Sequence, residues 1–203
     1  MLAGLNYLAH LLLAEATPAS RVGNLLGDFA TGWPESLRER FPAAVVAGIV
    51  RHRAIDGYTD SHPVMARLRE CVAPPRRRFA GVIVDLIYDH FLTRYWADYS
   101  PQPLAEFVRD CNQALRENRA ILPPELGETL EERIADRWLE HYGTDAGLAD
   151  VFRRVALRRA SFAPVREAIG DLQGHRAEFE AGFREFFPEL QAWVKACGPE
   201  KWP

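Results

Sequence analysis

The sequence predicts an all-α fold, and three observations support this prediction. Apolar residues recur at the three- and four-residue spacing of one helix face, and little of the chain alternates as a half-buried strand would. Prolines stand at the expected starts of several helices, where a missing N–H is tolerated because first-turn amides have no intrahelical acceptor. With 203 residues, the chain can bury a core without disulfides or structural zinc. We therefore expect one helical-bundle domain over residues 1–203.

Local start and stop signals place the expected helices along the first half of the chain. Ser20 is a suitable N-cap for the second helix, and Pro34 interrupts the chain after it. Pro42 begins a third helix, a short helix follows Pro63, and Pro74 begins the longest one. The expected ranges are 3–15, 21–30, 42–58, a short stretch after 63, and 74–99.

In the second half, short loops marked by Pro or Gly separate the helices, and the chain is expected to bend around Pro164. No internal repeat, low-complexity tract or Gly/Ser-rich linker divides the sequence. The further helices are expected over residues 102–121, 128–142, 146–160 and 173–196.

Composition and charge narrow the class of protein. Cys71, Cys111 and Cys197 form no CxxC pair, so we expect a reducing cytoplasm rather than a disulfide framework or a zinc–thiolate site. The net charge of −3 indicates no nucleic-acid partner. The run LNYLAHLLLA is too short for a membrane span and holds His10. The sequence also lacks the phosphate-binding loops of nucleotide enzymes and the nucleophile elbow of serine hydrolases.

The stretch VDLIYDHFL, residues 84–92, carries two carboxylates and an imidazole inside an apolar helix. Asp85 and Asp89 are four residues apart and share one helix face, and His90 follows directly. Two carboxylates in apolar surroundings repel each other and are poorly solvated. A metal ion would relieve both problems, and so would ion pairs with Arg53 or Arg94.

One-turn spacing of polar residues recurs in three other segments. If these polar faces converge, they form a pocket of His and Asp ligands that suits Mn²⁺ or Mg²⁺. Such an ion activates water and polarises a phosphoryl oxygen, so phosphoester hydrolysis is the expected chemistry. His10 also fits a core histidine, and Asp60 also fits a cap for the helix after Pro63. The pairs are Asn6 and His10, Asn24 and Asp28, His52 and Asp56, and Asp56 and Asp60.

Four stretches in combination resemble the acyl carrier protein phosphodiesterase family: NYLAHLLLA, GNLLGDF, GIVRHRAIDGYTDSHP and DLIYDHFLTRYW. Weaker similarity continues from LRRASFAPVREAI to HRAEFEAGFREFFPEL, so the resemblance covers nearly the whole chain. That family is similar to the HD-type phosphohydrolases, which implies a helical, metal-dependent fold. This chain has Asp89-His90, the reverse of the HD order. The resemblance implies removal of 4′-phosphopantetheine from the serine of holo acyl carrier protein, with Mn²⁺ or Mg²⁺ as cofactor.

Residues that match the family's motifs are expected at the site. Asp28 is the foremost catalytic candidate, because GNLLGDF matches most cleanly. As a mechanism, we expect His52 or His90 to protonate the leaving serine oxygen and Arg53 to hold a phosphate oxygen. The expected metal ligands are His10, Asp28, His52, Asp56, Asp60, Asp85 and Asp89.

Basic clusters are candidates for docking the acidic carrier protein. Arg76, Arg77 and Arg78 form the first candidate patch, and the arginines between residues 153 and 159 form the second. Two other functions fit the same sequence. One is a metal phosphohydrolase that acts on a nucleotide or another small phosphoester, and the other is a non-catalytic helical interaction module whose buried polar residues form only ion pairs.

Overall fold

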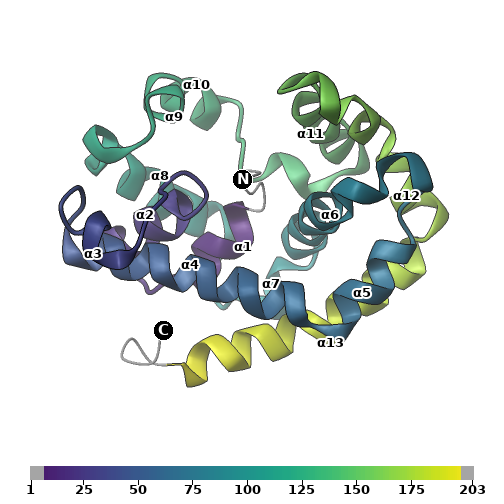
Figure 1. The fold of residues 1–203 in the computed structure, drawn as a ribbon, viewed down its shortest axis with the longest axis horizontal. Helices are drawn as coiled ribbons and strands as arrows, with labels where there is room; N and C mark the ends of the chain where they lie inside the picture. The colour runs from purple at the N-terminus through teal and green to yellow at the C-terminus, as the bar shows by residue number, and fades with distance from the viewer. Residues whose placement is uncertain (1–6, 198–203) are drawn as a thin grey trace.

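The computed structural model describes residues 7–197, and over this range it contains helices and no strand, which confirms the predicted all-α class (Figure 1). The expected start of the first helix, at residue 3, lies outside the described residues. The α-helices are α1 (Tyr7–Leu13), α2 (Pro18–Leu26), α3 (Pro34–Leu37), α4 (Ala43–Ser61), α5 (Pro63–Glu70), α6 (Ala80–Arg94), α7 (Trp96–Tyr99), α8 (Leu104–Glu117), α9 (Pro124–Glu128), α10 (Leu130–Ala135), α11 (Asp145–Leu157), α12 (Ile169–Gly174) and α13 (Arg176–Ala196). The 3₁₀ helices are η1 (Pro74–Phe79), η2 (Arg119–Ile121), η3 (His141–Gly143) and η4 (Ala160–Glu167).

Helix α6 lies inside the bundle because most of its surface is apolar. It packs against α1, α5, α11 and α13. Phe91 on α6 and Phe183 on α13 are fully buried, and their ring centroids lie 5.7 Å apart. A helix that is apolar nearly all round has to be covered on every side, so α6 sets the positions of the helices around it.

Helices α2 and α4 approach each other closely at two glycines. A Cβ built on Gly23 would lie 2.8 Å from the Cα of Gly48 and 2.2 Å from the carbonyl oxygen of Val45. The backbones can touch here because neither glycine carries a side chain. This contact brings the end of α2 beside the middle of α4, where the candidate site lies.

The boundaries of α2 differ from the prediction in a way that matters for the site. Thr17 rather than Ser20 is the N-cap, because its hydroxyl oxygen accepts a hydrogen bond from the amide of Ser20 (3.2 Å). The Ser20 hydroxyl instead accepts a hydrogen bond from the amide of Glu15 (3.0 Å). The helix ends two residues before Asp28, which therefore lies in a turn and not in the helix expected over 21–30.

Two long predicted helices are interrupted. The helix expected over 74–99 consists of η1, α6 and α7, with non-helical backbone at Tyr95 (φ −110°, ψ 25°). The helix expected over 128–142 is divided between α9, α10 and η3, with Arg137 at a positive φ of 52°. Neither Tyr95 nor Arg137 is next to Gly or Pro in the sequence. Gly and Pro, the residues that usually mark helix ends, therefore do not mark these breaks.

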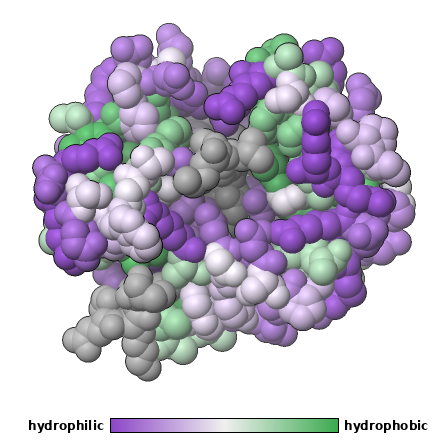
Figure 2. Space-filling view, viewed as in Figure 1, coloured by the Kyte–Doolittle hydropathy of each residue, from purple (hydrophilic) through white to green (hydrophobic). Residues whose placement is uncertain are grey.

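Within residues 7–197, no helix combines the length and the apolar character that crossing a membrane requires. The face of the molecule shown in Figure 2 is mostly hydrophilic, and hydrophobic side chains gather on it in small separate groups. Among residues 7–197, the exposed large apolar side chains are Trp33 and Leu157.

Candidate metal centre

Two histidines and one aspartate from α1 and α4 converge in the structure. His10 Nε2 lies 3.2 Å from Asp56 Oδ1, and His52 Nε2 lies 3.0 Å from Asp56 Oδ2. The two imidazole rings stack, with centroids 3.9 Å apart and an interplanar angle of 25°. One ligand atom from each residue lies within 4.8 Å of the others, a spacing that a single cation can bridge. We call His10, His52 and Asp56 the metal cluster.

Asp28 joins the metal cluster from the turn after α2. Its Oδ1 atom lies 3.3 Å from His52 Nε2, and its side chain is 8% exposed. Gly27 permits this approach, because a Cβ at that position would lie 2.1 Å from Cγ of His52. A side chain immediately before Asp28 would therefore displace the imidazole.

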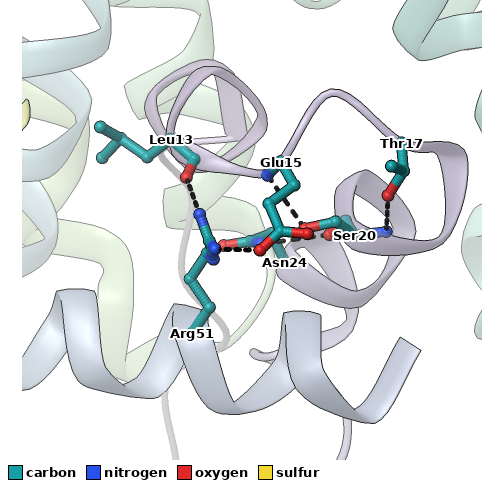
Figure 3. Close-up of polar contacts among 6 residues, drawn as sticks. All are labelled: Leu13, Glu15, Thr17, Ser20, Asn24 and Arg51. Atoms are coloured by element: carbon teal, nitrogen blue, oxygen red, sulfur yellow. Dashed lines mark hydrogen bonds and ion pairs between the residues drawn. The ribbon is translucent and has the colours of Figure 1, made fainter. Parts of the chain in front are cut away.

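A buried arginine fixes α4 against the end of α1. Arg51 donates one hydrogen bond to the carbonyl oxygen of Leu13 (3.2 Å) and one to Oε1 of Glu15 (2.5 Å). Figure 3 shows these bonds together with the polar contacts at the start of α2. Since His10 is on α1 and His52 is on α4, this network holds the two imidazoles in register.

The carboxylates around His52 favour a proton on its ring. Burial alone would lower the pKa of His52, but the hydrogen bonds and charges of Asp28 and Asp56 outweigh it and raise the pKa to about 10. Burial alone would raise the pKa of Asp56, but His10 and His52 hold it well below its usual range. Burial and the charge of His52 both lower the pKa of His10. Without a cation, the metal cluster therefore contains a protonated His52 and a neutral His10.

The donor set of the metal cluster fits a divalent cation. Both ring nitrogens of His10 and Nδ1 of His52 are buried. Within residues 7–197, the two Nδ1 atoms have no hydrogen-bond partner, and Nε2 of His10 has only the carboxylate of Asp56, at 3.2 Å. A buried polar atom without such a bond costs free energy unless a ligand satisfies it. Imidazole nitrogen combined with carboxylate oxygen suits divalent ions such as Mn²⁺. A cation at this position would satisfy a nitrogen of His10 and neutralise Asp56.

A pocket of about 470 Å³ opens onto the metal cluster. The Asp56 side chain is 49% exposed, whereas the two imidazoles are buried. A ligand can therefore reach the metal cluster from its carboxylate side. The lining residues are Gly27, Asp28, Ala30, Thr31, Gly32, Trp33, His52, Arg53 and Asp56.

Asp89 is not part of the metal cluster but holds the start of α1. Its two carboxylate oxygens accept hydrogen bonds from the amides of Leu8 (3.0 Å) and Ala9 (2.9 Å). Burial raises the pKa of Asp89 to about 7, although the two amides lower it. A carboxylate is favourable at the first amides of a helix. Asp89 therefore fixes the helix that carries His10.

The other two predicted residues of α6 face different surroundings. Asp85 is half-buried, and burial followed by the charges of nearby aspartates, Asp56 first, raises its pKa well above the usual range. His90 is fully buried, with Nδ1 2.8 Å from the carbonyl oxygen of Tyr142 and Nε2 3.8 Å from Asp145. The contacts of His90 thus lie with η3 and α11, not with the metal cluster.

Asp60 and Arg53, both on α4, make local contacts. Asp60 is exposed and pairs with Arg69 of α5. The Arg53 guanidinium donates hydrogen bonds to the carbonyl oxygens of Ala30 and Gly32, both at 2.7 Å. Arg53 also lines the pocket. Its two hydrogen bonds hold the loop that follows Asp28 in the chain.

The three consecutive arginines of η1 contact the protein itself. Arg76 forms a buried ion pair with Asp171, with bonds of 2.5 and 2.6 Å. Arg77 donates to backbone carbonyls just before η1, and Arg78 donates to the carbonyl oxygen of Ser161 (2.9 Å). Arg77 and Arg78 remain exposed, whereas Arg76 is engaged inside the protein.

Three residues that shape the site are not among the predicted ones: Gly27, Trp33 and Arg51. An arginine inside the apolar stretch AGIVRHRAI was a signal for a buried role of Arg51, because a buried guanidinium must find acceptors. The glycine before Asp28 was a weaker signal of close approach by another segment. Nothing local in the sequence marked Trp33.

Metal binding is expected to release about one proton, because a coordinating imidazole must be neutral and His52 is protonated up to a pH of about 10 without a cation. His10, with its lowered pKa, has no proton to lose near neutral pH. The affinity for Mn²⁺ should therefore rise with pH. Titration calorimetry in buffers of different ionisation enthalpy measures the released protons. Binding without proton release near neutral pH would contradict a protonated His52.

Comparison with known proteins agrees with these motifs. The family model described as acyl carrier protein phosphodiesterase matches residues 5–190. Three relatives with the same name come from Enterobacter sp. (strain 638), Escherichia coli O157:H7 (strain EC4115 / EHEC) and Klebsiella pneumoniae (strain 342). In the same order, they are 36%, 37% and 35% identical to this chain. The matched regions cover 94%, 93% and 92% of this chain and 98%, 96% and 95% of the relatives' own lengths. No solved structure matches the chain significantly. The match of sequence over nearly the full length shows that the chain belongs to the acyl carrier protein phosphodiesterase family.

Proposed function

We propose that this chain hydrolyses the phosphodiester that joins 4′-phosphopantetheine to the serine of holo acyl carrier protein, giving the apo form. The observation that carries this proposal is the metal cluster beside Asp28, which opens to solvent through a pocket. His and Asp ligands around a divalent ion support phosphodiester hydrolysis. Membership of the family, whose relatives bear the name of this activity, supports the choice of substrate.

His10, His52 and Asp56 are the proposed ligands of Mn²⁺, with Mg²⁺ as the alternative. When bound, the ion neutralises charge on the phosphodiester and lowers the pKa of a water. Asp28, with Oδ1 3.3 Å from His52 Nε2, is placed to accept a proton from the attacking water. The water oxygen bonds to phosphorus and its proton passes to Asp28, while the bond from phosphorus to the serine oxygen breaks and the serine oxygen takes up a proton from solvent water.

Docking through Arg77 and Arg78 is a second part of the proposal, and both side chains are exposed. Arg76 is left out, because its guanidinium is already paired with Asp171. Charge contacts between proteins speed association and weaken as salt rises. Sensitivity of KM to salt is therefore the signature of this docking patch.

Incubation of holo acyl carrier protein with this protein and Mn²⁺ is expected to remove the mass of 4′-phosphopantetheine from the carrier. Intact mass spectrometry measures the loss, and a chelator should abolish it. Asp28→Asn should be inactive while its helical content, followed by circular dichroism, stays unchanged. Turnover of nucleotides or other small phosphoesters, with holo carrier protein left intact, would refute the proposal.

A further inference from the structure

Trp33 is a large apolar side chain that stands almost fully in solvent. It is 81% exposed, and among the large apolar side chains of residues 7–197 only Leu157, at 70%, is comparable. An exposed indole gains little stability from burial in the free protein, and exposed apolar surface commonly marks an interaction site. Trp33 also lines the pocket that opens onto Asp28 and His52. It therefore stands at the mouth of the proposed active site.

The segment that carries Trp33 is held by specific bonds. Arg53 donates to the carbonyl oxygens of Ala30 and Gly32, both at 2.7 Å. Gly32 has a φ of 115°, a backbone conformation that glycine adopts without strain. The carbonyl oxygen of Trp33 accepts a hydrogen bond from the hydroxyl of Ser36 (2.9 Å). The outward position of the indole is thus built into the loop.

In the proposed substrate, the scissile phosphorus is bonded to the carrier protein through a single serine side chain. When phosphorus reaches Asp28 and the metal cluster, the backbone of the carrier must lie at the rim of the pocket. A tryptophan at that rim then meets the carrier surface. Tryptophan is enriched at the positions that dominate interface energies, because it offers a large flat apolar area and one N–H donor. We propose that Trp33 docks the carrier protein beside its modified serine, an inference that rests on the proposed function.

The contact made by Trp33 is expected to be apolar, because the exposed charges of the segment that follows it in the chain cancel. The exposed charged residues that follow it in the chain are Glu35, Arg38, Glu39 and Arg40. With two acids and two bases, this surface has no net charge that would attract an acidic partner. The contribution of Trp33 to KM should therefore persist at high salt, unlike docking by exposed arginines.

Trp33→Ala is expected to raise KM for holo acyl carrier protein by about tenfold or more, as truncation of a dominant interface residue does, with kcat within about twofold of wild type. Trp33→Phe is the matched control, because phenylalanine keeps a large apolar ring at the same exposed position. Its KM should rise less than that of Trp33→Ala. Hydrolysis of bis(p-nitrophenyl) phosphate with Mn²⁺ reports the metal centre without a protein substrate, and the rise in KM for holo carrier protein should exceed any change for this small diester.

An unchanged KM for holo carrier protein in Trp33→Ala would overturn the inference. Equal rises in KM for holo carrier protein and for a short serine peptide bearing 4′-phosphopantetheine would also overturn it, because the indole would then contact the arm. Slower hydrolysis of the small diester in both Trp33→Ala and Trp33→Phe would assign Trp33 to the pocket and reject docking. Failure of the proposed function looks different, since wild type would then cleave the small diester and leave holo carrier protein intact.

Discussion

Replacing Asp56 with Asn is expected to lower kcat/KM for holo acyl carrier protein by at least about 100-fold, since loss of residues that merely support metal ligands already costs about 10–100-fold. Asp56 contacts both imidazoles, with one oxygen 3.2 Å from His10 and the other 3.0 Å from His52. Asparagine keeps the shape but removes the negative charge that a divalent ion needs. Titration calorimetry with Mn²⁺ should show the loss of metal binding, and mass spectrometry of the carrier should show the loss of turnover.

Asp60→Asn is the matched control for this variant, because Asp60 lies one turn further along α4 and was predicted to be a ligand. Its carboxylate is exposed and pairs with Arg69, and an exposed pair contributes only about 0–1 kcal/mol. Activity and Mn²⁺ binding should stay within about twofold of wild type. An Asp60→Asn protein as inactive as Asp56→Asn would show that the metal cluster is incomplete without Asp60.

Replacing Asp89 with Ala is expected to lower the free energy of unfolding by about 3 kcal/mol, because two buried amides lose their acceptor and each unmet donor costs about 1–3 kcal/mol. The amides belong to Leu8 and Ala9 in the first turn of α1. For a domain of this size, the melting temperature should fall by about 10 °C. Thermal unfolding followed by circular dichroism measures both quantities. Because α1 carries His10, weaker Mn²⁺ binding should accompany the loss of stability.

Asp85→Asn provides the comparison for Asp89. Asp85 is on the same helix one turn earlier, it is half-buried, and its surroundings favour the uncharged carboxyl, which asparagine resembles. The change in unfolding free energy should be below about 1 kcal/mol. Equal destabilisation by the two substitutions would mean that α6 tolerates no change on this face, and the specific role of Asp89 as the anchor of α1 would be lost.

The helical fold could largely be predicted from the sequence, because prolines and apolar spacing are local signals of where helices begin and run. Pro63 begins α5 as expected, and the helix expected from residue 42 corresponds to α4, Ala43–Ser61. The breaks at Tyr95 and Arg137 have no such local signal. The hydroxyl of Tyr95 donates a hydrogen bond to Glu180, which is 85 positions away in the sequence. Gly and Pro in the sequence can predict where a helix begins or ends, but they do not predict a break that lacks such a residue.

The candidate site could be predicted only in part from the sequence. One-turn spacing shows which residues share a helix face, but it does not show which segment packs against that face. His52 and Asp56 have this spacing and lie together with His10. Asp85 and Asp89 have the same spacing, yet Asp89 meets backbone amides 80 and 81 positions away. Choosing between a ligand and a helix anchor therefore required the tertiary contact.

Because Asp89 anchors α1, the order of synthesis along the chain affects when α1 can take its final position. The metal cluster and Asp28 all lie before residue 57, but the carboxylate that orients α1 comes from α6. During translation, the ligands leave the ribosome well before Asp89 does, and domains complete their folding only when such distant partners have emerged. Correct placement of His10 beside His52 and Asp56 is thus tied to completion of the central helix.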